Sequence, residues 1–194
     1  RTLISDAGAR FDREIEIDAG TLAPMISWGT SPEHAVGIDQ CVPEDAPQRA
    51  LDYIGLEKGT SLRGIRIDAA FIGSCTNSRL SDLRQAAALL RGKRVADGVK
   101  AICVPGSSRV KREAEAEGLD RVFVEAGFEW RESGCSMCFY AGGESFGHGA
   151  RVASTTNRNF ESRQGPNVKT HIASPATVAA SALAGCLADP REIT

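Results

Sequence analysis

Apolar and polar residues follow a repeating pattern from about residue 61 to the C-terminus. Apolar runs of strand length alternate with stretches in which apolar residues recur every three or four positions, as on a helix with one buried face. The predicted strands are residues 65–73, 99–104, 151–155 and 170–173. The predicted helices are residues 81–91, a helix that follows the turn 105–108 and ends at Gly118, residues 120–126, and a last helix that follows Ser174. Strands alternating with helices predict an α/β fold, a mainly parallel sheet in three α/β/α layers.

The last helix has the clearest start in the chain. Ser174 and Pro175 supply a preferred N-cap hydroxyl and a preferred first helical residue. The spacing of Val178, Ala182 and Cys186 predicts one packed row, so Cys186 is interpreted as a packing residue.

Residues 1–60 are predicted to form an irregular N-terminal part that contains one short helix. The alternation in residues 14–18 predicts a strand, and the prolines, glycine and hydroxyls of residues 21–33 predict an ordered loop against which Trp28 packs. Asp45 can cap a helix that ends at Ile54. His34 is interpreted as a structural residue. Residues 61–194 then carry the strand–helix units, and the whole chain, residues 1–194, is expected to be one domain.

The overall composition excludes several classes of protein. The chain has 194 residues, a formal net charge of -2 and a pI near 6.0, whereas nucleic-acid-binding domains are strongly basic. It has neither an apolar run long enough to span a membrane nor a signal peptide at its first residues. Six cysteines without a secretory signal favour a reducing, cytoplasmic location over a disulfide framework.

Three of the six cysteines have the sequence context of metal ligands. Cys135 and Cys138 form a C-x-x-C pair, and Cys75 directly follows the predicted strand 65–73, where parallel sheets collect their ligands. A C-x-x-C pair is compatible with half of a zinc site, a redox dithiol or part of an iron–sulfur site. The preferred interpretation is a centre with three thiolates and an open fourth position. Cys41 lies in a polar loop without a partner, and Cys103 lies inside a predicted strand as a core thiol.

A second group of polar residues lies in the loop 154–165. Arg158 and Arg163 are five residues apart and are accompanied by Asn157 and Asn159. Guanidinium groups bind carboxylates with two parallel hydrogen bonds, so the loop is compatible with a polycarboxylate pocket. On spacing alone, a solvated loop with surface ion pairs is the favoured interpretation.

Taken together, these motifs resemble the aconitase superfamily and, within it, the C-terminal part (the third domain) of the large subunits of the 3-isopropylmalate dehydratase family. The resemblance covers almost the whole chain. It rests on Ser27-Trp28-Gly29-Thr30-Ser31-Pro32, Ile72-Gly73-Ser74-Cys75-Thr76-Asn77, Val104-Pro105-Gly106-Ser107, residues 125–131, Gly134-Cys135-Ser136-Met137-Cys138, residues 154–161 and His171-Ile172-Ala173-Ser174-Pro175.

The resemblance implies a site and a reaction. It makes Cys75, Cys135 and Cys138 the ligands of a [4Fe–4S] cluster whose fourth iron stays open for the substrate, and it makes Asn157, Arg158 and Arg163 substrate-binding or supporting residues. The implied reaction is the isomerisation of 2-isopropylmalate to 3-isopropylmalate by dehydration and rehydration, in leucine biosynthesis. The implied partners are a hydroxy-dicarboxylate substrate, a small subunit and the N-terminal domains of the large subunit. Neither a membrane nor a nucleic acid is an expected partner.

The chain also departs from the family pattern. Ser162 stands where glycine is common, and residues 140–148 differ from the usual loop after the second cluster cysteine. The N-terminal domains that carry the family's acid–base residues have no counterpart here, so we assign no catalytic acid or base to this chain and expect it to be inactive alone. Whether the isolated domain retains the cluster is left open. The alternatives are an aconitase- or homoaconitase-type hydratase, a zinc-binding structural domain without catalysis, and a regulatory or scaffold domain.

Overall fold

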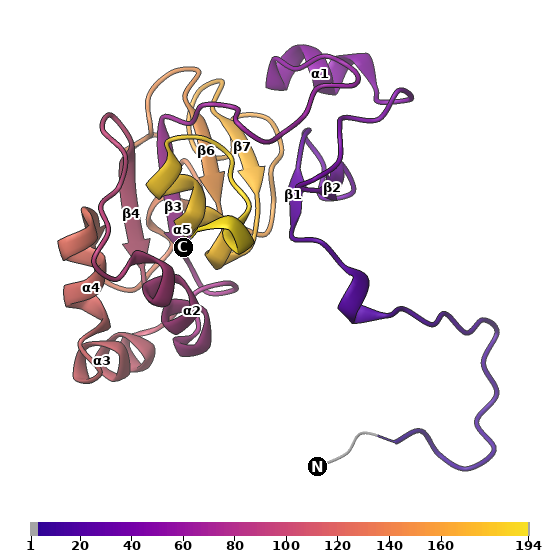
Figure 1. The fold of residues 1–194 in the computed structure, drawn as a ribbon, viewed down its shortest axis with the longest axis horizontal. Coiled ribbons are helices and arrows are strands. Elements are labelled where there is room, and N and C mark those ends of the chain that lie inside the picture. The colour runs from indigo at the N-terminus through magenta and orange to yellow at the C-terminus, as the bar shows by residue number, and fades with distance from the viewer. Residues whose placement is uncertain (1–3, 194) are drawn as a thin grey trace.

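The centre of the molecule is a five-stranded sheet in the order β5-β4-β3-β6-β7 (Figure 1). The structure is a computed structural model that describes residues 4–193. Every neighbouring pair of strands in this sheet is parallel, which confirms the predicted α/β class with a mainly parallel sheet. The strands are β3 (Ala69–Gly73), β4 (Lys100–Val104), β5 (Phe128–Trp130), β6 (Arg151–Ser154) and β7 (Lys169–Ile172).

The helices follow the strands as the sequence pattern predicts. They are α1 (Gln48–Ile54), α2 (Leu80–Leu90), α3 (Ser108–Ala116), α4 (Leu119–Ala126) and α5 (Pro175–Ala184), with short 3-10 turns η1 (Ala19–Thr21), η2 (Ser136–Cys138) and η3 (Pro190–Glu192). The predicted cap of α5 is confirmed, because the Ser174 hydroxyl accepts a hydrogen bond from the Thr177 amide.

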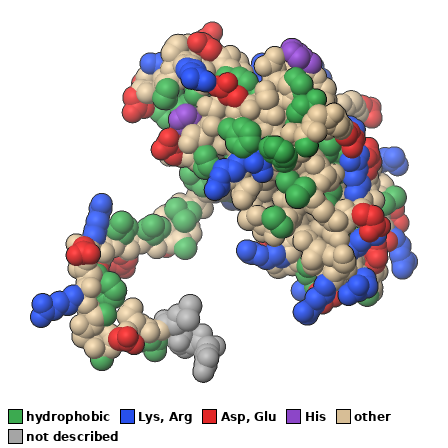
Figure 2. All heavy atoms as spheres, turned by 180° about the vertical axis from the view of Figure 1, so that it is seen from behind, with side chains coloured by type: hydrophobic (Ala, Val, Ile, Leu, Met, Phe, Trp, Pro, Cys, Tyr) green, Lys and Arg blue, Asp and Glu red, His purple; other side chains and the backbone are tan. Residues whose placement is uncertain are grey.

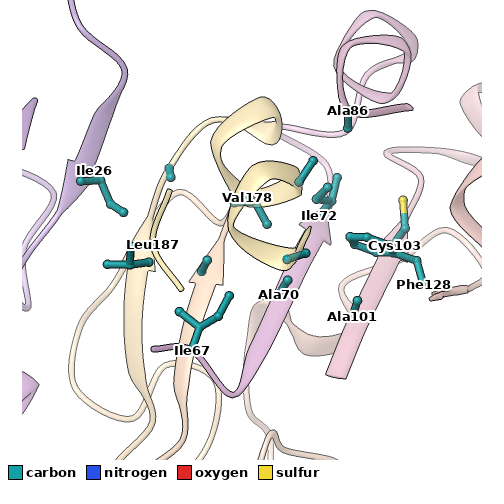
Figure 3. Close-up of a cluster of buried hydrophobic side chains, with 14 of the residues drawn as sticks. Ile26, Ile67, Ala70, Ile72, Ala86, Ala101, Cys103, Phe128, Val178 and Leu187 are labelled. Carbon is teal, nitrogen blue, oxygen red and sulfur yellow. The ribbon is translucent and has the colours of Figure 1, made fainter. Parts of the chain in front are cut away.

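Successive residues of β3 point to opposite faces of the sheet and into two apolar clusters. Ala70 and Ile72 belong to the larger cluster, which α2 and α5 cover with residues such as Ala86 and Val178 (Figure 3). Phe71 points to the other face, into a second cluster. Residues of irregular segments cover this second face: Met137, Cys138, Phe146, Ala150 and Val168. The segment that carries two of the candidate ligands is therefore packed directly on the sheet.

The C-terminal end of α5 differs from the prediction. The helix stops at Ala184, because Gly185 adopts a left-handed conformation (φ 71°) and its amide donates to the Ser181 carbonyl. Cys186 therefore lies outside the helix, half-buried, in an isolated bridge with Arg66. The predicted helical row is wrong at this residue.

The other two cysteines assigned no ligand role agree with their interpretation. Cys103 is fully buried in β4, and burial raises the pKa of its thiol well above the usual value. Cys41 is exposed in its loop.

The strand predicted at residues 14–18 does not form. Among residues 4–24, the only regular element is η1, and the segment extends away from the body (Figures 1 and 2). Ile15 and Ile17 are each 67% exposed. An alternating sequence gains its hydrogen bonds only from a neighbouring strand, and none lies beside it in residues 4–193.

Residues 25–37 form a small hairpin that the sequence pattern did not indicate. Strands β1 (Met25–Ser27) and β2 (Ala35–Gly37) are antiparallel, and Ile26 bridges to Ala173 just beyond β7. Trp28 is buried, which confirms its predicted packing role, and it stacks on the ring of His34 with 4.6 Å between the ring centroids. The hairpin shares the larger apolar cluster with the sheet.

A buried histidine joins this hairpin to the sheet. His171 in β7 has its Nδ1 2.7 Å from the Ser27 carbonyl and its Nε2 2.7 Å from an Nη of Arg151. Because a guanidinium only donates, Nε2 accepts and Nδ1 carries the proton. Burial, together with the charge of Arg151, lowers the pKa of His171 to about 3, so the ring is neutral.

Across residues 4–193, no helix combines the length and the apolar character that a membrane crossing requires.

Candidate metal and substrate site

Cys75 lies in the turn that leaves the carboxyl end of β3, as predicted. Ser74 takes a positive φ of 71°, which turns the chain sharply at the strand end. The Thr155 hydroxyl fixes this strand end, because it accepts a hydrogen bond from the Gly73 amide (2.9 Å) and donates to the Gly73 carbonyl (3.2 Å). Cys75 itself is exposed. Its thiol is therefore accessible to a metal or a small molecule at the edge of the sheet.

Cys135 and Cys138 lie at the two ends of a single 3-10 turn. The Cys138 amide donates to the Cys135 carbonyl at 2.9 Å, and Ser136 between them has a positive φ of 41°. Cys135 is exposed, whereas Cys138 is buried against the sheet. The turn thus has one thiol at the surface and one beneath it.

The turn of Cys135 and Cys138 packs on the strand that leads to Cys75. Met137 and Cys138 share the second apolar cluster with Phe71, which lies in β3 four residues before Cys75. Burial raises the pKa of the Cys138 thiol and the neighbouring Cys135 adds to the increase, whereas the charge of the Arg163 guanidinium acts in the opposite direction. The fold thus brings the turn of two predicted ligands to the strand that ends at the third.

The described residues contain no preformed site for a single metal ion. All six cysteines are free. Among residues 4–193, no three His, Cys, Asp or Glu side chains converge closely enough to hold one metal ion.

Asn157 and Arg158 follow β6 at the same edge of the sheet and are exposed. An Nη of Arg158 donates to the Asn157 carbonyl at 2.8 Å. Among the described residues, Arg158 has no carboxylate partner within ion-pair distance. Asn157 and Asn77 border a mainly apolar cavity of about 370 Å³. Both predicted side chains are thus accessible to a small molecule.

Arg163 is placed differently from Arg158. Its Nε donates a 2.6 Å hydrogen bond to the carbonyl of Cys138. Its guanidinium lies over the rings of Phe139 and Phe160, at 5.5 and 5.1 Å from their centroids. Arg163 therefore connects the arginine loop to the cysteine loop. The sequence grouped it with Arg158 and did not indicate this connection.

Two buried polar residues that the sequence analysis left without a role also hold the site. The Gln164 amide donates to the Met137 carbonyl at 2.8 Å, inside the C-x-x-C pair, and accepts from the Thr170 hydroxyl. The Asn159 amide donates to the carbonyls of Gly29 and Ser31. Amides in a polar loop carry no sequence signal for such contacts, because their partners are distant in the chain.

Ser162, which stands where the family commonly has glycine, adopts a backbone conformation that favours glycine. Ser162 has a φ of 60°, a left-handed conformation that glycine adopts without strain and other residues adopt at a cost of about 1–2 kcal/mol. Its hydroxyl accepts a hydrogen bond from the Asn167 amide at 3.1 Å, across the same turn. The turn therefore retains the geometry for which glycine is suited while carrying a serine.

The loop 140–148, which departs from the family pattern in sequence, is held by an ion-pair network. Arg131 donates to Glu144 through both of its terminal nitrogens, at 2.7 and 2.9 Å, and Lys100 donates to the same carboxylate at 2.9 Å. The hydrogen bond with Arg131, followed by that with Lys100, lowers the pKa of Glu144 to about 2. Arg131 also reaches the Ser136 hydroxyl at 3.4 Å. The network thus ties this loop to the C-x-x-C turn.

Comparisons with known proteins agree with the motifs of this site. Residues 1–185 match the model of the aconitase family (aconitate hydratase). The chain is 66% identical over 201 aligned positions to a 3-isopropylmalate dehydratase large subunit of Cupriavidus necator, covering 98% of this chain and 75% of that protein. It is 57% identical, again over 98% of the chain, to 3-isopropylmalate dehydratase large subunit 1 of Bradyrhizobium diazoefficiens, of which it spans 42%.

Proposed function

Because the chain belongs to the aconitase family, we propose that it is the cluster-binding part of a hydro-lyase of the 3-isopropylmalate dehydratase type. The reaction is the isomerisation of 2-isopropylmalate to 3-isopropylmalate, by loss and return of water, as a step of leucine biosynthesis. The observation that carries the proposal is the packing of the Cys135–Cys138 turn on the strand that leads to Cys75, because Met137 and Cys138 share an apolar cluster with Phe71 of β3.

The donor set suits an iron–sulfur cluster. Cys75, Cys135 and Cys138 would hold it, and cysteine thiolates are the usual protein ligands of such clusters. A zinc site built from the same three thiolates is the alternative, and the metal content of the chain distinguishes the two.

Three thiolate ligands would leave one iron of such a cluster without a protein ligand, and the bound cluster would supply Lewis acidity for the departure of hydroxide. The protein's own residues supply the surroundings. Arg163 fixes the Cys138 carbonyl, and Gln164 fixes the Met137 carbonyl, so the turn that carries two of the proposed ligands is held from its buried side.

The substrate is proposed to be a hydroxy-dicarboxylate bound at Asn157, Arg158 and Arg163. Arg158 is exposed and has its second terminal nitrogen free of any hydrogen bond within residues 4–193, which suits two-pronged binding of a carboxylate. Arg163 uses Nε for the Cys138 carbonyl, which leaves its terminal nitrogens for a second carboxylate. The rings of Phe139 and Phe160, over which the guanidinium lies, would keep it in one orientation.

The site requires groups from outside this chain. Elimination needs a base to take a proton and an acid to assist the leaving hydroxyl, and each typically contributes 10²–10⁴-fold. His171 cannot supply either, because both of its ring nitrogens are engaged in the core. We therefore propose that the remaining large-subunit domains and a small subunit complete the site, and that residues 1–194 alone are inactive. The six free cysteines are consistent with the proposed cytoplasmic location.

Turnover of 2-isopropylmalate tests this function. The full-length large subunit that contains this chain would be assembled with its small subunit under anaerobic conditions. We expect turnover in that assembly, none with residues 1–194 alone, and a loss of at least 100-fold after Cys135→Ser or Arg158→Ala. Cys41→Ser is the matched control and should leave the rate unchanged. An assembly that hydrates only an aconitate-type substrate would replace this function with the alternative hydratase.

A further inference from the structure

A tyrosine on α1 closes the turn that carries the second arginine. The Tyr53 hydroxyl accepts a hydrogen bond from the Ser162 amide at 2.5 Å and donates one to the Val168 carbonyl at 2.8 Å. The two partners lie more than 100 residues from Tyr53 and at opposite ends of the turn 162–168. One oxygen atom thus joins the two ends of this turn to α1.

The turn 162–168 contains several residues in strained or left-handed backbone conformations. Three of its residues have positive φ values: Ser162 (60°), Gly165 (139°) and Asn167 (56°). The two that are not glycine adopt a conformation that costs each about 1–2 kcal/mol without compensation. The Ser162 amide is partly buried, and a buried N–H without a hydrogen-bond partner destabilises the fold. The Tyr53 hydroxyl supplies that partner.

The backbone link from Ser162 to Arg163 and two hydrogen bonds of Arg163 connect this turn to the candidate site. Ser162 directly precedes Arg163, whose Nε donates to the Cys138 carbonyl. The Arg163 carbonyl in turn accepts from the Tyr140 amide at 2.8 Å. Arg163 is therefore bound to the cysteine loop through both its side chain and its backbone, and its position depends on the turn that Tyr53 closes.

We propose that Tyr53 is a positioning residue, which sets the place of Arg163 relative to the C-x-x-C turn through the Ser162 amide. Its contribution to substrate binding rests on the function proposed above, whereas its control of the turn does not. An ion pair between Arg49 and Glu161 also joins α1 to the loop, at 3.2 Å, but the Arg49 side chain is 87% exposed. Exposed pairs of this kind contribute little, so the tyrosine is the main connection.

Tyr53→Phe tests the proposal, because it removes one oxygen and retains the ring. Amide hydrogen exchange would be measured by NMR on residues 1–194. We expect exchange at the Ser162 amide to become at least tenfold faster, and exchange at the Tyr140 amide and the Arg163 Nε–H to become faster as well. Exchange in β3 and β4 should stay unchanged. Gln48→Ala is the control and should alter none of these signals, because Gln48 is exposed on the same helix and its only side-chain hydrogen bond within residues 4–193 is to Asp52.

The second measurement uses the full-length large subunit assembled with its small subunit. We expect Tyr53→Phe to raise KM for the hydroxy-dicarboxylate about five- to tenfold with kcat changed less than twofold, because a misplaced arginine weakens ground-state and transition-state binding alike.

Unchanged exchange at Ser162 would overturn the hydrogen bond itself. Faster exchange at Ser162 with unchanged Arg163 Nε–H exchange, or with unchanged KM, would reduce Tyr53 to a structural residue. An assembly inactive with the wild-type chain would contradict the proposed function alone, since the exchange data would still decide the role of Tyr53.

Discussion

The Nε of Arg163 lies 2.6 Å from the carbonyl oxygen of Cys138, and this hydrogen bond joins the arginine loop to the cysteine loop. The Arg163 backbone accepts a second bond from Tyr140, directly beyond Phe139. The residue predicted to bind substrate is therefore also a structural part of the turn that carries two of the predicted cluster ligands. A change at Arg163 should affect the stability of the chain before any substrate is present.

Arg163→Lys tests this dual role, because it retains the charge but not the planar guanidinium that lies over the rings of Phe139 and Phe160. We expect the free energy of unfolding to fall by about 1–2 kcal/mol, as for a lost charged hydrogen bond. Urea denaturation of residues 1–194 measures it. Arg158→Lys is the matched control: its side chain is exposed and bonded only to the preceding carbonyl, so its effect should stay below about 0.5 kcal/mol. Equal effects of the two variants would contradict the assignment.

The buried His171 predicts an acid-dependent loss of stability. Its pKa is lowered to about 3 in the folded chain, against an unperturbed value of about 6.5. Between these values the unfolded chain binds a proton that the folded chain does not, so stability is lost as the pH falls through that window. The slope is about 1.4 kcal/mol per pH unit, or about 2 kcal/mol between pH 6.5 and pH 5.0.

Urea denaturation at those two pH values measures the effect. His171→Asn removes the titrating ring and should lose most of this pH dependence, although its stability at pH 7 will be lower because the core contacts are altered. A wild-type chain whose free energy of unfolding is the same at pH 6.5 and pH 5.0 would show that the ring is accessible to protons in the folded state.

Glu144 gives a prediction at lower pH. Its pKa is lowered from 4.5 to about 2 by Arg131 and Lys100, so its contribution to stability is present above pH 4.5 and is lost as the pH falls toward 2. Because the Glu144 side chain is 48% exposed, solvent screens much of this interaction. Glu144→Gln should therefore lower the free energy of unfolding at pH 7 by only about 1 kcal/mol, and less in 1 M salt. Glu125→Gln, outside this network, is the control. A loss above 3 kcal/mol that is insensitive to salt would indicate a buried ion pair instead.

The sequence predicted the part of the fold that depends on local pattern. The apolar run that ends in Gly73-Ser74-Cys75 identified a buried strand followed by a turn, and the helix after Ser174 began where its cap predicted. Short elements were missed: β5 has three residues, and β1 and β2 lie among prolines and glycines that indicate loops. The segment 14–18 had the right alternation for a strand but has no strand beside it in the described chain.

Of the candidate site, the sequence identified residue types but not their connections. The cysteines and the arginines stand in recognisable motifs. Tyr53, Gln164 and Asn159 do not, because each acts on a backbone group that only the tertiary fold brings near. For the same reason, the separate positions of Arg158 and Arg163 could not be derived from their spacing. Their assignment to substrate and that of the three cysteines to a cluster stay predictions.

The three assigned ligands can be separated from the other cysteines by substitution. Cys75→Ser, Cys135→Ser and Cys138→Ser should each lower the iron content of the anaerobically reconstituted chain by more than half, because serine is a poor ligand for a soft metal site. Cys41→Ser and Cys186→Ser replace thiols that lie outside both cysteine loops and should leave iron unchanged. Iron analysis with a colorimetric chelator measures the difference. Loss of iron from Cys41→Ser equal to that from Cys75→Ser would contradict the ligand set.

The most direct test of the central claim is the ratio of iron, acid-labile sulfide and zinc to protein in residues 1–194 after anaerobic reconstitution with all three elements present. Three cysteine ligands on one [4Fe–4S] cluster predict about four irons and about four sulfides per chain. They also predict a broad visible absorption that disappears in Cys135→Ser. A colourless chain with about one zinc and no sulfide would contradict the account and would establish a metal-binding structural domain in its place.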